Sequence, residues 1–379
     1  MRLEFLRRGL LFGMALVGAA FSNAALANPS ILFDLKTGEV IEHEDAFQRW
    51  HPASLTKLMT AYVTFRAVTA GELALDSPIK MSKHAAAEPP SKMGYKAGSV
   101  MTLDNALKMM LIKSANDIAM AVGENVGGSE ETFVKRMNAE AVRLGMTNTH
   151  FVNPNGLHAP DQYTTAHDLA VLVSAIRNEF PQYAPYFAIQ GLKAGKKKLM
   201  SYNMLVGRYA GADGMKTGFV CPSGFNMVGS ATRNGKTLVA VVLGAPSAVG
   251  RTDVVAGLLD NGFETTVKQD TTLATLPVYG LANAAPVDMR EHICGKKKPV
   301  EAQSEAGADH EGQAVKSPWL EKLQNPKLVV VGLGGATGPI PLAMRDENGQ
   351  EYSDVPIPTP RPDYTPVAKA TAQGDTVAN

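Results

Sequence analysis

The order of apolar and polar residues predicts strands at both ends of the chain's main folded part. Short apolar runs at 31–34 and 40–41 surround a polar turn and are typical of a hairpin. Longer runs at 225–230 and 237–243 flank Asn234-Gly235, a strong tight-turn signal. We therefore expect the first and last strands to share one antiparallel sheet.

The residues between these strands follow a helical spacing instead. Apolar positions recur every three or four residues, Thr102 is a suitable helix N-cap, and Gly145 is a suitable stop. Helices are predicted over 53–70, 102–110, 117–124, 132–144 and 165–177, with a closing helix over 254–263. The pattern predicts an α/β (α+β) fold in which helices flank an antiparallel sheet.

The first residues have the pattern of a secretory signal peptide. Arg2, Arg7 and Arg8 precede an apolar stretch at 10–21, and Ala25-Leu26-Ala27 is a small-x-small cleavage site. The stretch is shorter than the ~20 apolar residues that span a bilayer, and we find no longer one downstream. We expect cleavage of residues 1–27 and a soluble, periplasmic protein.

The rest of the chain divides at about residue 265. We expect the main domain at 28–265 and a linker with a small β element at 266–345, including a strand at 327–331. A proline-rich tail at 346–379 should be disordered, because repeated prolines prevent regular structure.

Charge and composition exclude several classes of function. Lys and Arg number 37 against 36 Asp and Glu, so nothing favours nucleic acid as a partner. The eight histidines show no metal-ligand spacing, so no metal or other cofactor is implied.

Cys221 and Cys294 can form a disulfide in an exported protein or remain separate thiols, and the sequence leaves both open.

Three short motifs carry the candidate chemistry: Ser54-Leu55-Thr56-Lys57, Ser114-Ala115-Asn116 and Lys216-Thr217-Gly218. Each of these motifs alone occurs often by chance. In this order they match the S-x-x-K, S-x-N and K-T-G set of penicillin-binding proteins and serine β-lactamases. The set describes a serine acyltransferase with a lysine base.

The first motif supplies a nucleophile and a base. Ser54 and Lys57 lie three residues apart on a predicted helix and therefore share one face. A serine hydroxyl is a weak nucleophile until a base takes its proton, and a lysine can do so when burial or a nearby cation lowers its pKa. We predict that Ser54 attacks, that Lys57 is the base, and that the Ser54 N–H faces the oxyanion.

The second motif is predicted to lie in a turn between two helices. Ser114 and Asn116 are two residues apart, so they face one cleft only from a non-helical turn. In that position Ser114 can relay a proton between Lys57 and the leaving amine, and Asn116 can bind the substrate backbone and the lysine.

The third motif opens a strand. Lys216 supplies positive charge, Thr217 a hydroxyl, and Gly218 lets a substrate lie close to the strand edge. The main-chain N–H of Phe219 is the expected second oxyanion donor. Another K-T-G, at 36–38, sits in a hairpin turn before the S-x-x-K helix, and we assign it no chemistry.

With these motifs, residues 28–265 resemble the D-alanyl-D-alanine carboxypeptidases, which are low-molecular-mass penicillin-binding proteins of serine peptidase family S11. Further segments carry the likeness: 52–60, 114–117, 151–157, 163–170, 213–219 and 244–246. The resemblance implies the serine β-lactamase/penicillin-binding-protein fold with a helical subdomain. It also implies removal of the terminal D-alanine from the peptidoglycan stem pentapeptide through an acyl-enzyme, with β-lactams as inhibitors.

The resemblance implies a role for Arg251, and the sequence differs from the pattern of the family in two places. Arg251 is implied to hold the substrate's terminal carboxylate with Lys216 and Thr217, a task that suits a guanidinium. Phe219 stands where some members carry histidine, which affects side-chain details of the pocket. The tail is proline-rich, whereas membrane-held members end in an amphipathic helix, so stable membrane attachment is not expected.

Two other classes of function are less well supported. A class A β-lactamase should carry S-D-N and a downstream E-x-x-L-N, but Ala115 stands in the middle motif and no such glutamate motif follows before Lys216. A non-catalytic β-lactam sensor or peptidoglycan-binding protein would need membrane spans to pass a signal inward, and we expect none after cleavage. Endopeptidase activity on cross-links stays open within the resembled family.

Overall fold

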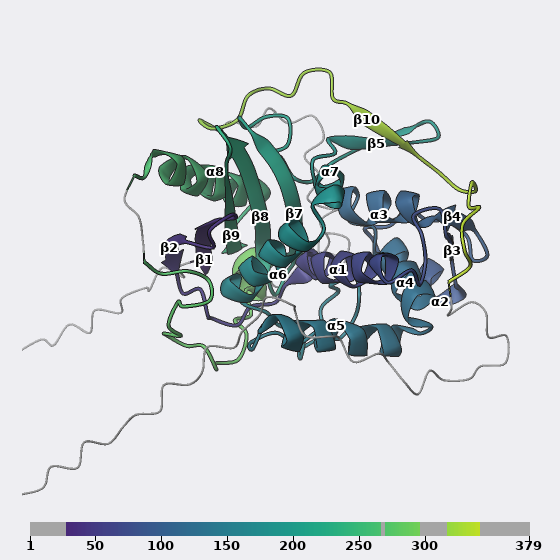
Figure 1. The fold of residues 1–379 in the computed structure, drawn as a ribbon, viewed down its shortest axis with the longest axis horizontal. Coiled ribbons are helices and arrows are strands. Elements are labelled where there is room, and N and C mark those ends of the chain that lie inside the picture. The colour runs from purple at the N-terminus through teal and green to yellow at the C-terminus, as the bar shows by residue number, and fades with distance from the viewer. Residues whose placement is uncertain (1–27, 267–269, 296–316, 342–379) are drawn as a thin grey trace, which may run out of the picture.

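The computed structural model describes residues 28–266, 270–295 and 317–341 (Figure 1). The predicted signal peptide at 1–27, the predicted tail at 346–379 and residues 267–269, 296–316 and 342–345 of the predicted linker lie outside these residues. The described chain forms a central sheet with helices on both faces and a mainly helical region beside it.

The central sheet has five strands in the order β2-β1-β9-β8-β7, and each neighbouring pair is antiparallel. The strands are β1 (Ser30–Asp34), β2 (Val40–Glu44), β7 (Ala212–Val220), β8 (Gly224–Arg233) and β9 (Lys236–Ala245). Ile31 of β1 lies opposite Val241 of β9, which confirms that the first and last strands share one sheet. Strand β7, which carries the K-T-G motif, is an edge strand.

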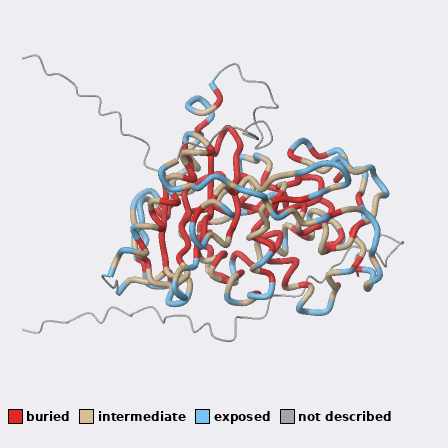
Figure 2. Tube along the Cα trace, turned by 90° about the horizontal axis from the view of Figure 1, so that it is seen from above, coloured by how far each residue is buried: buried red, intermediate tan, exposed pale blue. Residues whose placement is uncertain are grey.

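Both faces of the sheet are buried. Helix α8 (Ala248–Glu264) packs on one face and α6 (Ala166–Glu179) on the other (Figure 1). Side chains alternate along a strand, so Leu32 joins the cluster with Val255 of α8, whereas Ile31 and Phe33 join the larger core of the helical region. Strands β1, β7, β8 and β9 are buried along most of their length, and Figure 2 shows buried chain gathered in the interior of the molecule.

The helical region surrounds α1, which follows the turn η1 (Ala53–Leu55). Its helices are α1 (Thr56–Thr69), α2 (Lys83–Ala87), α3 (Leu103–Ile112), α4 (Asn116–Gly127), α5 (Glu130–Leu144) and α7 (Ala184–Phe187), with a 3₁₀ turn η2 (Pro181–Tyr183). Thr102 Oγ1 accepts the Asn105 N–H at 3.1 Å, and Gly145 ends α5 at a φ of 78°. Both predicted helix ends are therefore confirmed.

The chain after α8 packs back on this domain. Strand β10 (Leu328–Val331) confirms the strand predicted at 327–331, and it pairs in parallel with β5 (Gly191–Ala194), which also pairs with β6 (Lys197–Met200). In Figure 1 this small sheet lies above α3. Strands β3 (Pro78–Lys80) and β4 (Val100–Thr102) form a further pair.

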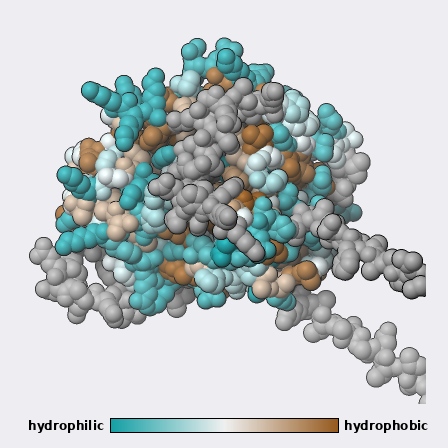
Figure 3. Space-filling model, turned by 180° about the vertical axis from the view of Figure 1, so that it is seen from behind, coloured by the Kyte–Doolittle hydropathy of each residue, from teal (hydrophilic) through white to brown (hydrophobic). Residues whose placement is uncertain are grey.

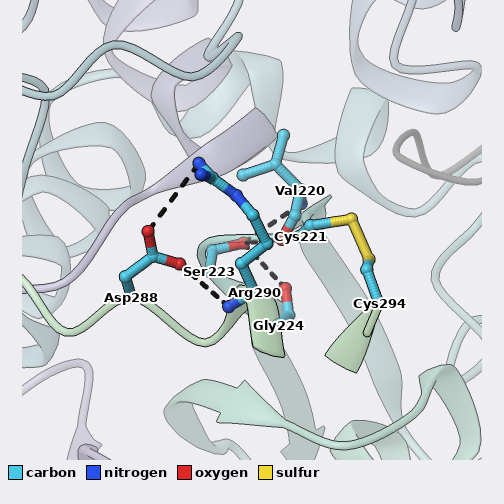
Figure 4. The surroundings of a disulfide bond; sticks show 7 residues. All are labelled: Val220, Cys221, Ser223, Gly224, Asp288, Arg290 and Cys294. Carbon is cyan, nitrogen blue, oxygen red and sulfur yellow. Dashed lines mark hydrogen bonds and ion pairs between the residues drawn. A yellow bond between two sulfur atoms is a disulfide. The ribbon is translucent and has the colours of Figure 1, made fainter. Parts of the chain in front are cut away.

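Cys221 and Cys294 form a disulfide, with their Cα atoms 5.7 Å apart (Figure 4). Cys294 directly follows the short helix α9 (Arg290–Ile293), and the Met289 N–H donates to the Pro222 carbonyl at 2.9 Å. Of the two alternatives that the sequence left open, the structure has the pair. It joins the segment after the main domain to the hairpin between β7 and β8.

Within the described ranges, no helix combines the length and apolar character that crossing a membrane requires. On the face drawn in Figure 3, hydrophobic residues form separate patches among hydrophilic ones.

Replacing both cysteines by serine should lower the free energy of unfolding by about 3 kcal/mol. The cross-link closes a long loop, with a sequence separation of 73 residues, and so restricts the unfolded chain. Urea denaturation of the oxidised protein and the double serine variant measures the difference. Reductant should bring the natural protein to the variant's midpoint, and equal midpoints without reductant would contradict the prediction.

Candidate active site

Ser54 lies in the turn η1, immediately before α1, and the surrounding main chain holds that turn in an uncommon conformation. Ala53 has a φ of 48°, in the left-handed region that residues other than glycine rarely adopt. A Cβ at Gly156 would collide with the Ala53 carbonyl, so only glycine allows this close approach. The buried Asn226 amide donates to the carbonyls of His51 (2.9 Å) and Pro52 (3.2 Å).

Lys57 is completely buried one helical turn after Ser54. Its Nζ donates to Ser54 Oγ at 2.9 Å, to Asn116 Oδ1 at 2.8 Å and to the Asn155 carbonyl at 2.5 Å. These three acceptors are uncharged, so they orient the Lys57 amine but do not offset a positive charge on it. The Lys57–Ser54 distance allows direct proton transfer.

Ser114 reaches the site from the non-helical link between α3 and α4, as predicted, whereas Asn116, which was predicted in the same turn, belongs to α4. Ser114 has a φ of 58°, and Asn116 is the first residue of α4. Besides accepting from Lys57, Asn116 donates through Nδ2 to the Pro89 carbonyl at 3.0 Å. These bonds on both ends of the amide fix its orientation.

Lys216 extends from the edge strand β7 to the second motif. Its Nζ donates to Ser114 Oγ at 2.9 Å and to the Thr217 carbonyl at 2.8 Å, and all three residues are buried. Because β7 is an edge strand, alternate main-chain groups along it face away from β8.

Gly218 brings β7 against the turn that carries Ser54. A Cβ there would lie 3.0 Å from the Pro52 carbonyl oxygen, 3.0 Å from the Ser54 nitrogen and 3.1 Å from the Leu55 nitrogen. We expected this glycine to make room for a substrate, and the structure shows that it makes room for the Ser54 turn. The three motifs thus meet pairwise: Lys57 with Asn116, Lys216 with Ser114, and Gly218 with Ser54.

Phe219 and Arg251 lie on the other side of β7. The Phe219 ring stacks on Phe225 with centroids 4.2 Å apart. Arg251, in the first turn of α8, is only 1% exposed, and its Nη1 donates to the carbonyls of Gly218 and Asn226 at 3.2 Å each. Arg251 therefore supports the two strands beside the site.

Two asparagines outside the three motifs also shape the site. Asn226 holds the Ser54 turn, and Asn155 supplies a main-chain acceptor for Lys57. Asn155 lies in the turn Asn153-Pro154-Asn155-Gly156, which the sequence does show, but a main-chain contact leaves no motif of its own. The second K-T-G at 36–38 lies in the β1–β2 turn, away from these contacts.

Buried groups near the site have shifted pKa values. Burial lowers the pKa of His51, which favours the neutral imidazole next to the nucleophile turn. Burial raises the pKa of Asp117, although N–H groups of Met93 (3.1 Å) and Gly94 (2.9 Å) bind its carboxylate. Asp117 thereby ties the segment before α3 to the first turn of α4.

A metal centre is not apparent in the described ranges. No group of three or more histidine, cysteine, aspartate or glutamate side chains is placed there to hold an ion.

A protein-family model described as D-alanyl-D-alanine carboxypeptidase matches residues 18–247. Among curated proteins, D-alanyl-D-alanine carboxypeptidase DacF of Bacillus subtilis is 33% identical over 245 residues, which are 62% of this chain and 62% of the relative. DacC of Escherichia coli is 34% identical over 261 residues, or 66% of this chain and 65% of the relative. The chain thus spans under two thirds of the length of these relatives.

Solved structures show the same similarity. The D-alanyl-D-alanine carboxypeptidase DacD from Francisella tularensis aligns with a TM-score of 0.61 and 28% identity, covering 72% of this chain and 77% of the other. Penicillin-binding protein D2 from Listeria monocytogenes, in its ampicillin-bound form, aligns with a TM-score of 0.58 and 31% identity, covering 63% and 98%. The expected penicillin-binding-protein fold is confirmed.

Replacing Gly218 by alanine should lower the free energy of unfolding by about 2 kcal/mol, because the new methyl group meets main-chain atoms that cannot move aside cheaply. Chemical denaturation measures the change. Gly257→Ala is the matched control, since that helical position meets Trp319 only at 3.6 Å, and we expect a gain of about 0.5 kcal/mol there. Equal effects at the two positions would contradict the prediction.

Proposed function

The chain belongs to the D-alanyl-D-alanine carboxypeptidase family, peptidase family S11, and from this premise we propose that it is a serine D-Ala-D-Ala carboxypeptidase. Its substrate would be the stem pentapeptide of peptidoglycan, from which it removes the last D-alanine. The observation that carries the proposal is the buried Lys57 amine, 2.9 Å from the partly exposed Ser54 hydroxyl.

The contacts support a two-step acyl transfer. Ser54 Oγ attacks the carbonyl carbon of the D-Ala–D-Ala bond while Lys57 takes its proton. The N–H groups of Ser54 and Phe219 hold the oxyanion, and the Gly218 contact keeps those two segments together. The carbon–nitrogen bond breaks, D-alanine leaves with a proton passed through Ser114, and water then hydrolyses the ester on Ser54.

Positive charge beside β7 suits a substrate that ends in a carboxylate. Lys216 and Thr217 lie on the strand itself, and Arg251 lies directly behind it, bonded to the Gly218 carbonyl. We propose that the substrate extends along the open edge of β7 with its carboxylate toward these residues, and that Asn116 binds its backbone.

β-Lactams are proposed to acylate Ser54 as mimics of the same peptide. One structural relative, the Listeria penicillin-binding protein, has been solved with ampicillin bound. The peptidoglycan substrate and the signal-peptide pattern at 1–27 support a periplasmic location, and so does the disulfide, which persists in an oxidising compartment.

Ser54→Ala should lower the rate of D-alanine release from diacetyl-Lys-D-Ala-D-Ala by about 10³-fold or more and abolish labelling by fluorescent penicillin, because no acyl-enzyme can form. Released D-alanine and gel fluorescence measure the two effects. Ser174→Ala, the same change on the outer helix α6, should behave as the natural protein. Penicillin turnover many times per second would instead favour a β-lactamase.

Arg251→Gln should reduce kcat/KM about tenfold for a peptide that ends in D-Ala–D-Ala carboxylate, because a positive charge is lost near the carboxylate. The kcat/KM for the same peptide with a terminal amide should change little. The ratio of kcat/KM for the carboxylate peptide to kcat/KM for the amide peptide should therefore fall. Loss on both peptides to the same degree would assign Arg251 to support of the strands alone.

A further inference from the structure

The polar contacts of Lys57 continue to a carboxylate that the proposed mechanism does not use. The Asn155 carbonyl accepts from Lys57 at 2.5 Å, and the side chain of the same asparagine donates through Nδ2 to Glu88 Oε2 at 3.0 Å. One residue thus connects the base at the centre of the site to Glu88, which follows α2.

Glu88 is 9% exposed, and its carboxylate lies near His84, which is closer to solvent. The other carboxylate oxygen, Oε1, lies 3.8 Å from His84 Nε2, and the His84 side chain is 56% exposed. Glu124 and Glu130 face the same imidazole at 3.0 Å and 4.0 Å. The contacts therefore run from solvent, through His84, Glu88 and Asn155, to the amine that activates the nucleophile.

The charge on Glu88 is sensitive to its neighbours. Burial raises its pKa, and nearby Glu130 acts in the same direction. His84, the Asn155 amide and Lys57 oppose that rise. Coupling between two ionisable groups is reciprocal, so the charge of Glu88 acts on the proton affinity of Lys57 as well.

The sign of that effect follows from electrostatics. Burial alone disfavours the ammonium form of Lys57 and would make its amine a weak base. A nearby negative charge stabilises the ammonium form and restores basicity. On the other side of the site, Lys216 is bonded to Ser114 and adds positive charge with the opposite effect.

We propose that Glu88 is a positioning residue for Lys57: through Asn155 it fixes the carbonyl that orients the amine, and its negative charge sets the pH at which the amine becomes free to accept the Ser54 proton. This inference rests on the proposed function, because acylation of Ser54 is the step that it affects.

Glu88→Gln tests the proposal, because glutamine keeps an acceptor for Asn155 and removes the charge. The second-order rate of acylation by a fluorescent penicillin is measured against pH. The acidic limb of this pH–rate profile should move about one pH unit lower in the variant, since Lys57 loses its proton more easily. The plateau rate should fall about threefold, because the amine is a weaker base. The ¹³Cε chemical shift of Lys57 in lysine-labelled protein should titrate about one unit lower as well.

Glu130→Gln is the matched control. This substitution removes a negative charge that also faces His84, but Glu130 does not contact Asn155. The acidic limb of its pH–rate profile should stay within about 0.3 pH units of that of the natural protein. An unmoved limb in Glu88→Gln, or an equal shift in Glu130→Gln, would overturn the proposal.

Two further readouts keep the outcome decisive. If Glu88→Gln does not fold, Glu88→Asp keeps the charge and withdraws it from Asn155, so its limb should stay near that of the natural protein while the rate falls. A moved limb in Glu88→Asp would overturn the proposal. If the natural protein is not acylated at all, the proposed function fails, and the Lys57 chemical shift still tests the effect of Glu88.

Discussion

A contact between two stretches of main chain determines the geometry of the site. Strand β7 can approach the Ser54 turn only because Gly218 has no side chain, and main-chain atoms lie 3.0 Å from where a Cβ would stand. Gly156 and Asn226 fix the same turn from other directions. Main-chain contacts have no rotamers to adjust, so the Ser54 turn and strand β7 keep one relative position. The oxyanion donors that we propose, one on each segment, are preorganised by this contact rather than by binding of a substrate.

Two buried lysines then decide what the site can do. Lys57 meets a hydroxyl, a side-chain amide and a main-chain carbonyl, and Lys216 meets a hydroxyl and a main-chain carbonyl. Neutral partners compensate for lost hydration but leave the charge in place, whereas a direct carboxylate partner would hold the proton on the amine. In the proposed function, Lys216 supplies positive charge for the substrate carboxylate and Lys57 is the base. Glu88 acts on that balance from one residue farther away.

The sequence predicted the parts of this arrangement that have a periodic or local signature. Long helices and the strands β1, β8 and β9 bury whole faces, so their spacing is visible, whereas β3 to β6 have three or four residues each and too little pattern to detect. The three motifs predicted side chains that the structure brings together and, through Ser114, the link between two helices. Asn155, Asn226 and Glu88 could not be found in this way, because their roles depend on contacts made only after folding.

Strand β7, along which we propose that the peptide lies, is an edge strand of the central sheet, and contacts hold it at both ends. At the start of β7, Asp213 accepts from Nη1 and Nη2 of Arg177 at 3.1 Å each. Burial raises the pKa of Asp213, but these contacts outweigh it and hold the pKa below its usual value. Just past its end, Cys221 is bonded to Cys294 of the returning segment. The strand along which we propose that the substrate lies is thus held at both ends and against the Ser54 turn in between.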